Sequence, residues 1–180
     1  VDYFRDALDA IFLSNSVYTF LTAPAANTGS DKQRSLWAAM PVVWIWDDHD
    51  YGPNDSDRTS PSRTASRAVY REYCPHYPLQ AGGPDAAIYH SFRVGRCVFV
   101  VTDNRSERSP KGDTDNASKV VWSDEQKTWF QNQVLAASAD PDVQAIFWVN
   151  TFPWIGAASA GADTWQGYTT ARQEIVDWLD

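Results

Sequence analysis

The sequence lacks several features that would place it in common protein classes. No stretch approaches the roughly 18 apolar residues that a membrane-spanning helix needs. Its start, VDYFRDALD, carries acids where a signal peptide carries basic residues. Basic residues are outnumbered, 15 against 23, for a net charge of −8, which argues against a nucleic-acid partner because phosphate backbones need clustered Lys and Arg. We expect a mature soluble chain or an excised piece of one. Because the chain is acidic, an anionic substrate would need a bound cation.

Cysteine and histidine are also scarce. Cys74 and Cys97 could form a disulfide, be two buried thiols, or be neither, and buried thiols are favoured. Cysteine use therefore leaves the compartment open. Of the three histidines, His76 falls in a proline-flanked loop and His90 in an expected hairpin strand, whereas His49 lies among carboxylates. Only His49 is thus a candidate for site chemistry.

What is present is enough for a folded core. With 180 residues, 43% of them apolar, no internal repeat and no linker, the chain predicts one domain of the α/β class, a mixed sheet with flanking helices. The predicted helices are 2–13, 62–74, 123 to about 137, and a last one from Thr170. The predicted strands are 42–46, 88–94, 97–102 and 145–149. Residues 23–31 and 105–121 are expected loops.

Local signals support these elements. Gly95 and Arg96 suit a tight β-hairpin turn. Ser123 with Gln126, and Thr170 with Gln173, have the spacing of capping boxes at helix starts. The strand, helix and strand across residues 97–149 imply a parallel pair.

The segment PVVWIWDDHDYGPND, residues 41–55, concentrates the chemistry. Its apolar run, 42–46, predicts a strand buried on both faces. Asp47, Asp48, His49 and Asp50 follow at once, at the carboxyl end where open α/β sheets bind ligands. Such adjacent charges repel one another unless a cation or an anion organises them. The segment therefore predicts a ligand site.

Two other predicted strands also end in polar residues. Asp103, Asn104 and Arg105 follow one, and Asn150 follows the other. Carboxylate and amide oxygens suit divalent or trivalent metals, and the planar fork of Arg105 suits a phosphate oxygen. A histidine beside a metal-bound phosphate can donate a proton to a leaving oxygen.

Structural roles compete with these functional ones. Any one Asp can simply cap a turn, and Arg105 is at least as well suited to a structural ion pair. The quartet is harder to explain by structure alone. The nine tryptophans could form a stacking surface, but four lie on elements with core periodicity, which favours packing. These four are Trp44, Trp46, Trp129 and Trp148.

WDDHDYGPND resembles the WDDH-(D/E) motif of the PhoD-like, or alkaline phosphatase D, phosphodiesterases of the calcineurin-like metallophosphoesterase superfamily. Four more segments are similar to that family in the same order. They are VYREYCP (69–75), VTDNRSER (101–108), WSDEQKTWF (122–130) and DTWQGYTTAR (163–172). The resemblance implies that residues 1–180 are the central segment of a single PhoD-like domain, a partial metallophosphoesterase α/β sandwich.

The resemblance also implies roles. WDDHD takes the place of a Gly-Asn-His-(Asp/Glu) motif, so Asp48 aligns with a metal ligand and His49 with the histidine that contacts phosphate. Asp50 would orient His49, and Asp47 has no ligand role by this correspondence. Asn150 lies where other branches place another ligand. Two or more metal ions are implied, iron with calcium being one pairing and Mn, Mg or Zn others.

The implied activity is metal-dependent hydrolysis of phosphate mono- or diesters, with metal-activated water as the nucleophile. The family's early aspartates, ending in Gly-Asp, and its late Gly-Asp-x-His are not in these 180 residues, so we expect the remaining parts of the domain as partners and the isolated chain to be inactive. Many relatives are exported, which suggests a secreted or cell-surface protein. The alternative is a non-catalytic Trp-rich binding module with a structural Ca²⁺.

Overall fold

A computed structural model describes residues 5–6 and 39–180 of the chain. The chain divides into two compact units, Val1–Trp44 with Ala68–His76, and Ile45–Arg67 with Tyr77–Asp180. The predicted loop at 23–31 and the helix predicted at 2–13 lie outside the described residues, apart from residues 5 and 6, which are helical. All candidate site residues belong to the second unit.

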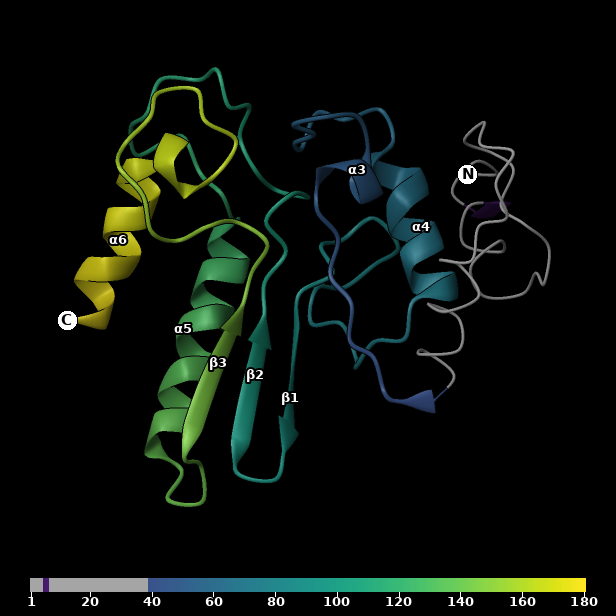
Figure 1. Cartoon of the computed structure of the whole chain (residues 1–180), viewed down its shortest axis with the longest axis vertical. Helices are drawn as coiled ribbons and strands as arrows, with labels where there is room; N and C mark the ends of the chain where they lie inside the picture. The colour runs from purple at the N-terminus through teal and green to yellow at the C-terminus, as the bar shows by residue number, and fades with distance from the viewer. Residues whose placement is uncertain (1–4, 7–38) are drawn as a thin grey trace. The chain divides into compact units, whose positions relative to one another are not determined.

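The second unit contains a three-stranded mixed sheet, seen in Figure 1. Strands β1 (His90–Val94) and β2 (Cys97–Val101) form an antiparallel hairpin, and β3 (Ala145–Val149) pairs with β2 in parallel. Gly95 in the hairpin turn has φ of 57°, a conformation that glycine adopts without strain. The predicted hairpin and parallel pair are therefore confirmed.

The helices from residue 39 onward are the short α3 (Asp48–Tyr51), α4 (Arg63–Tyr73), α5 (Asp124–Ala139), the 3₁₀ turn η1 (Trp165–Gly167) and α6 (Thr169–Leu179). Three of them, α4, α5 and α6, follow the predicted order, whereas the short helix α3 and the 3₁₀ turn η1 were not predicted. Ser123 caps α5 as predicted, accepting from the Gln126 N–H at 3.3 Å. The Gln126 side chain instead bonds the Asp103 backbone, accepting from its N–H at 2.7 Å and donating to its carbonyl at 3.0 Å. The helix start is thereby tied to the end of β2.

The capping box predicted at Thr170 is wrong. Helix α6 begins one residue earlier, at Thr169, and no N-cap side chain bonds its first turn. The Asp115 carboxylate, from the loop before α5, accepts from the Thr169 N–H at 2.8 Å and the Thr170 N–H at 3.3 Å. A distant residue thus satisfies the helix start, and sequence spacing cannot reveal such a cap.

The strand predicted at 42–46 is also wrong. Residues 41–47 belong to no strand, and Val43 is 38% exposed. An apolar run becomes a central strand only where neighbours pair with both of its edges, and none of the described strands does so here. Trp44 instead accepts at its carbonyl from the Tyr70 hydroxyl at 2.7 Å.

The core of the second unit lies between the sheet, α5, η1 and α6. Its buried members include Val100, Trp122, Phe130 and Trp165, with Trp148 and Trp129 packed against them. The tryptophan rings meet edge to face, as for Trp122 with Trp165 at 5.5 Å and 89°. The predicted core packing of Trp129 and Trp148 is confirmed, as is that of Trp46, which is 1% exposed.

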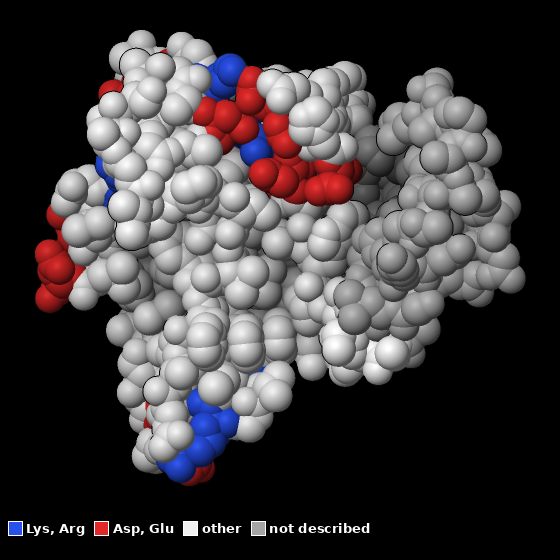
Figure 2. Space-filling model, in the orientation of Figure 1, with Lys and Arg blue, Asp and Glu red and all other residues white. Residues whose placement is uncertain are grey.

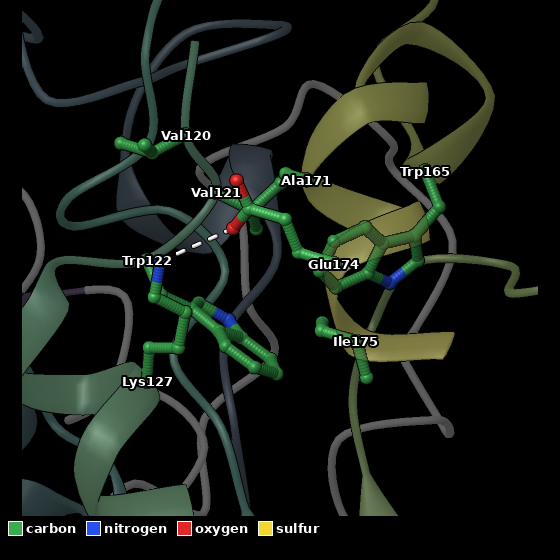
Figure 3. Close-up of a pocket in the computed structure, with 8 residues that line it drawn as sticks. All are labelled: Val120, Val121, Trp122, Lys127, Trp165, Ala171, Glu174 and Ile175. Atoms are coloured by element: carbon green, nitrogen blue, oxygen red, sulfur yellow. Dashed lines mark hydrogen bonds and ion pairs between the residues drawn. The ribbon is translucent and has the colours of Figure 1, made fainter. Parts of the chain in front are cut away.

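A shallow pocket opens at the margin of this core, and Figure 3 shows the Lys127–Glu174 ion pair beside it. The two charged atoms, Nζ and Oε2, are 3.1 Å apart and join α5 to α6. The pocket is lined by Val120, Val121, Trp122, Lys127, Trp165, Ala171, Glu174 and Ile175.

Cys74 and Cys97 are thiols and form no disulfide. Within residues 5–6 and 39–180, no helix has the length and apolar character to cross a membrane.

Candidate metal centre

The acidic quartet forms the tight start of α3. Asp47 is the N-cap, and its backbone N–H donates to the Asp50 carboxylate at 3.0 Å. Figure 2 shows acidic side chains, with basic ones among them, gathered on the surface near α3, whereas another basic group lies toward the β1–β2 turn. Arg105, which follows β2, donates to Asp47, so the quartet is joined to the carboxyl end of β2 although the strand predicted to precede it is absent.

Asp48 and His49 share this turn but face different surroundings. The Asp48 carboxylate, 15% exposed, accepts from the His49 N–H at 2.8 Å and the Asp55 N–H at 2.9 Å. The His49 side chain is 75% exposed, with Nε2 3.9 Å from the Asp48 carboxylate and 3.2 Å from the Asn54 amide oxygen. Asp48 is thus oriented by the backbone, while the imidazole can reach a ligand from solvent.

The two carboxylates of α3 differ in acidity. Burial alone would raise the pKa of Asp48, but the hydrogen bond from the Asp55 N–H and the positive charge of Arg105 outweigh this and lower it. Burial raises the pKa of Asp50, and the charges of the two preceding aspartates add to that effect. Asp48 is therefore the better prepared of the two to stay ionised as a ligand.

Asp48 meets two carboxylates that the sequence reasoning missed. One oxygen each of Asp48, Asp55 and Asp163 lie within 4.8 Å of one another, and all three residues are partly buried. Asp55 ends the same WDDHDYGPND segment, and Asp163 begins DTWQGYTTAR. The family-like segments contained both residues, but no spacing rule joins positions more than a hundred residues apart.

Three basic side chains balance this cluster. Arg105, 2% exposed, donates through Nε to Asp47 at 2.7 Å and through Nη1 to Asp163 at 2.8 Å. Arg108, fully buried, pairs with the other Asp163 oxygen, and Lys111 pairs with Asp55. The cluster is therefore an ion-pair network as well as a set of possible ligands.

Arg105 has few donors left for a phosphate. Besides its two carboxylate partners it donates to the Ser56 carbonyl at 3.3 Å, and its guanidinium lies 4.6 Å from the Phe152 ring centroid. These bonds use four of the five N–H groups of Arg105, so the paired phosphate contact that its planar fork suits would require one of these carboxylates to release it.

Asp103, at the end of β2, is fully buried and holds the surrounding loops together. Its Oδ1 accepts from the Trp46 indole at 2.9 Å and from the N–H groups of Arg105 and Ser106, each at 3.0 Å. Its Oδ2 accepts from the Ile88 N–H at 3.0 Å and from the Ser106 hydroxyl. Asp103 thus serves the scaffold behind the site.

Asn150 and Asp50 are placed less directly for their predicted roles. The Asn150 amide oxygen accepts from the Phe152 N–H at 3.1 Å and the Trp165 indole at 3.3 Å, so both of its lone pairs are engaged. The Asp50 carboxylate bonds the Asp47 backbone, and among the described residues it is Asn54 that contacts the His49 ring nitrogen. Their roles as ligand and orienting group stay predictions.

The cluster fits a hard cation by its donor set. Carboxylate oxygens are the ligands that Ca²⁺, Mg²⁺ and Mn²⁺ prefer, and such ions need several that converge from different segments. Asp48 at the start of α3, Asp55 in the turn that follows it and Asp163 before η1 meet this requirement from two separate segments of the chain. The arrangement can hold a cation next to an exposed imidazole.

Comparisons with known proteins agree with this architecture. A family model described as PhoD-like phosphatase matches residues 14–180. Alkaline phosphatase D of Bacillus subtilis (strain 168) is 28% identical over 175 residues, covering 81% of this chain and 29% of that protein. A solved structure entitled "Structure of PhoD" matches with a TM-score of 0.63 and 22% identity, over 83% of this chain and 34% of that one. The chain thus spans about a third of the length of either.

Proposed function

Because the chain belongs to the PhoD-like phosphatase family, we propose that it is the central segment of one PhoD-like domain whose full-length protein hydrolyses phosphate mono- or diesters. Family membership indicates phosphoester hydrolysis, and the acidic cluster is consistent with metal dependence. Since the chain spans 29% of the curated relative, the remaining ligands are proposed to come from the rest of that domain.

One observation carries the proposal. An exposed imidazole, His49, adjoins a partly buried carboxylate, Asp48, whose two oxygens are already aimed by backbone N–H groups. A structural acid would be satisfied by such contacts, but it would not need a solvent-facing histidine beside it. The pairing suits a site at which the carboxylate holds a cation and the imidazole meets an anionic substrate.

The roles follow from these positions. Asp48 would hold a metal ion, with Asp55 and Asp163 as further carboxylates and Asn150 as the amide ligand proposed from the family. Metal ions so held supply Lewis acidity toward a phosphoryl oxygen and activate water as the nucleophile.

His49 would contact the phosphate or the leaving oxygen, steadied by Asn54 at Nε2. Asp50 would support the imidazole only after leaving the Asp47 N–H. Iron with calcium is the metal pairing that we propose.

Replacement of His49 in the full-length protein tests this function. His49→Gln keeps a hydrogen-bonding side chain for Asn54 but cannot act as an acid, and we expect kcat on an aryl phosphomonoester and an aryl phosphodiester to fall by about 10²- to 10⁴-fold. The matched control is His76→Gln, the same change at a histidine of the first unit, with turnover retained. Undiminished turnover in His49→Gln would remove His49 from the reaction.

The competing function is a non-catalytic module in which the carboxylates hold a structural Ca²⁺. The ion pairs that join Asp55 and Asp163 to Lys111, Arg105 and Arg108 favour it, because they tie separate loops together. Chelator treatment during thermal unfolding distinguishes the two functions. A lower melting temperature in a full-length protein that hydrolyses neither aryl ester would favour the structural role.

A further inference from the structure

Asp55 is the one non-glycine residue with positive φ, 61°, in the described part of the chain. Aspartate tolerates this left-handed conformation better than most residues, but the conformation still needs support from its surroundings. The Asp55 N–H donates to the Asp48 carboxylate at 2.9 Å, so its direction depends on that backbone conformation. The orientation of Asp48 is therefore coupled to a strained position seven residues away.

Arg108 supplies that support from a different loop. Its side chain is fully buried, and its Nη2 donates to the Asp55 carbonyl at 2.6 Å and the Ser56 carbonyl at 3.0 Å. Its Nη1 pairs with the Asp163 carboxylate and donates to the Asp163 carbonyl at 3.1 Å. A single guanidinium thus fixes the two peptides after the turn and anchors them to the segment before η1.

The backbone of Arg108 adds to the same junction. Its carbonyl accepts from the Arg58 N–H at 3.1 Å, and its own N–H donates to the Arg105 carbonyl at 3.4 Å. The guanidinium also lies 5.4 Å from the Phe152 centroid and 5.6 Å from the Tyr168 centroid. Arg108 is therefore held on its aromatic sides and by its backbone, and can act as a rigid support.

We propose that Arg108 is a positioning residue, which holds Asp55 in the left-handed conformation so that the Asp55 N–H aims the Asp48 carboxylate beside His49. It acts through Asp55 and touches neither substrate nor reacting atoms. Its catalytic consequence rests on the proposed phosphoester hydrolysis, but its structural consequence, an aimed Asp48 carboxylate, does not.

Lysine at position 108 tests the guanidinium. Arg108→Lys keeps the charge but offers one nitrogen where the structure uses two separate groups, one for Asp163 and one for the carbonyls. In the full-length protein, we expect the amide of Asp55 to exchange with deuterium at least about tenfold faster, because its charge-assisted hydrogen bond loosens. We also expect kcat to fall by about 10- to 100-fold while KM changes little.

The matched control is Arg67→Lys. Arg67 is equally buried but pairs with Asp85 and Glu107, away from the Asp55 turn. It should lose comparable stability while the exchange of residues 48–58 and kcat stay as in the wild type. Equal effects of the two lysine variants on that exchange would overturn the proposal.

A second pair of variants isolates the backbone and does not alter Arg108. Asp55→Ala and Asp55→Asn both remove the carboxylate, but only alanine strains a left-handed position, since asparagine adopts it readily. We expect faster exchange at amide 55 in Asp55→Ala than in Asp55→Asn. Identical exchange in the two would overturn the proposal even if Arg108→Lys fails to fold. Full activity in both variants, with the exchange difference intact, would remove Asp55 from the proposed metal site and leave the structural role of Arg108 standing. Absence of phosphoester turnover in the unaltered full-length protein would refute the proposed hydrolysis instead.

Discussion

Removal of the Asp103 carboxylate should be among the most damaging single changes in this chain. Five donors converge on its two oxygens, namely the N–H groups of Ile88, Arg105 and Ser106, the Trp46 indole and the Ser106 hydroxyl. All lie in buried surroundings, so Asp103→Ala would leave several polar groups without partners. Truncating one member of a buried charged network costs about 3–5 kcal/mol. The free energy of unfolding of a whole domain is usually about 5–15 kcal/mol, so this loss is a large part of it.

Two further variants make the prediction sharper. Asp103→Asn keeps one acceptor oxygen but turns an amino group toward the Ile88 N–H or its neighbours, so we expect a loss of about 1–3 kcal/mol. Asp113→Asn, the same change at an exposed residue of the following loop, should stay within about 0.5 kcal/mol of the wild type. Urea unfolding of the full-length protein, followed by tryptophan fluorescence, gives all three values. An Asp103→Ala protein within about 1 kcal/mol of the wild type would refute this reasoning.

Three other outcomes are expected. Burial raises the pKa of Asp115, but hydrogen bonds from Thr169 and Thr170 outweigh it and lower the pKa. The cap therefore stabilises α6 at pH values above 3.8, the ordinary pKa of aspartate, and this stabilisation is lost as pH falls through the folded-state pKa. Asp115→Ala should lower the free energy of unfolding, measured with urea, by about 0.5–2 kcal/mol at pH 7 and by much less in acid.

Burial alone would lower the pKa of Lys127, but its hydrogen bond and ion pair with Glu174 outweigh burial and raise the pKa. The pair therefore stabilises the folded chain fully at pH values below 10.5, the ordinary pKa of lysine, and this stabilisation is lost as pH rises through the folded-state pKa. Glu174→Gln should cost about 0.2–1 kcal/mol, less in high salt. The 180-residue chain expressed alone should be inactive and should bind Mn²⁺, Ca²⁺ and Fe²⁺ only weakly in calorimetric titration. It should also self-associate in size-exclusion chromatography, because open sheet edges pair with other chains. A monomer with submicromolar metal affinity and measurable turnover would contradict this prediction.

Local signals predicted the elements whose partners are close in sequence. The β1–β2 hairpin was predictable because Gly95 lies between two alternating strands, and α5 because Ser123 precedes a run with helical spacing. The segment 42–46 failed because apolar content says nothing about whether another strand pairs with it. The start of α6 failed because its cap, Asp115, is 54 residues away.

The same limit applies to the candidate site. The WDDHD motif identified Asp48 and His49 as a local pair, and the structure places them side by side. Asp163 and Arg108 could not be joined to them from the sequence, because their contacts depend on how three loops fold over the end of the sheet. A short motif can therefore identify adjacent site residues, but the contacts that position them come from residues far apart in the sequence.

The charge balance explains how so many aspartates can share one end of the sheet. Asp163 gives one oxygen to each of Arg105 and Arg108, Asp55 pairs with Lys111, and Asp47 pairs with Arg105. Asp48 differs, since neutral backbone N–H groups hold both of its oxygens and its only ion-pair partner in the described residues is His49, at 3.9 Å. Each of those oxygens keeps a lone pair. Asp48 is therefore the carboxylate that can bind a cation without first giving up a basic side chain, and the surrounding pairs hold it in place.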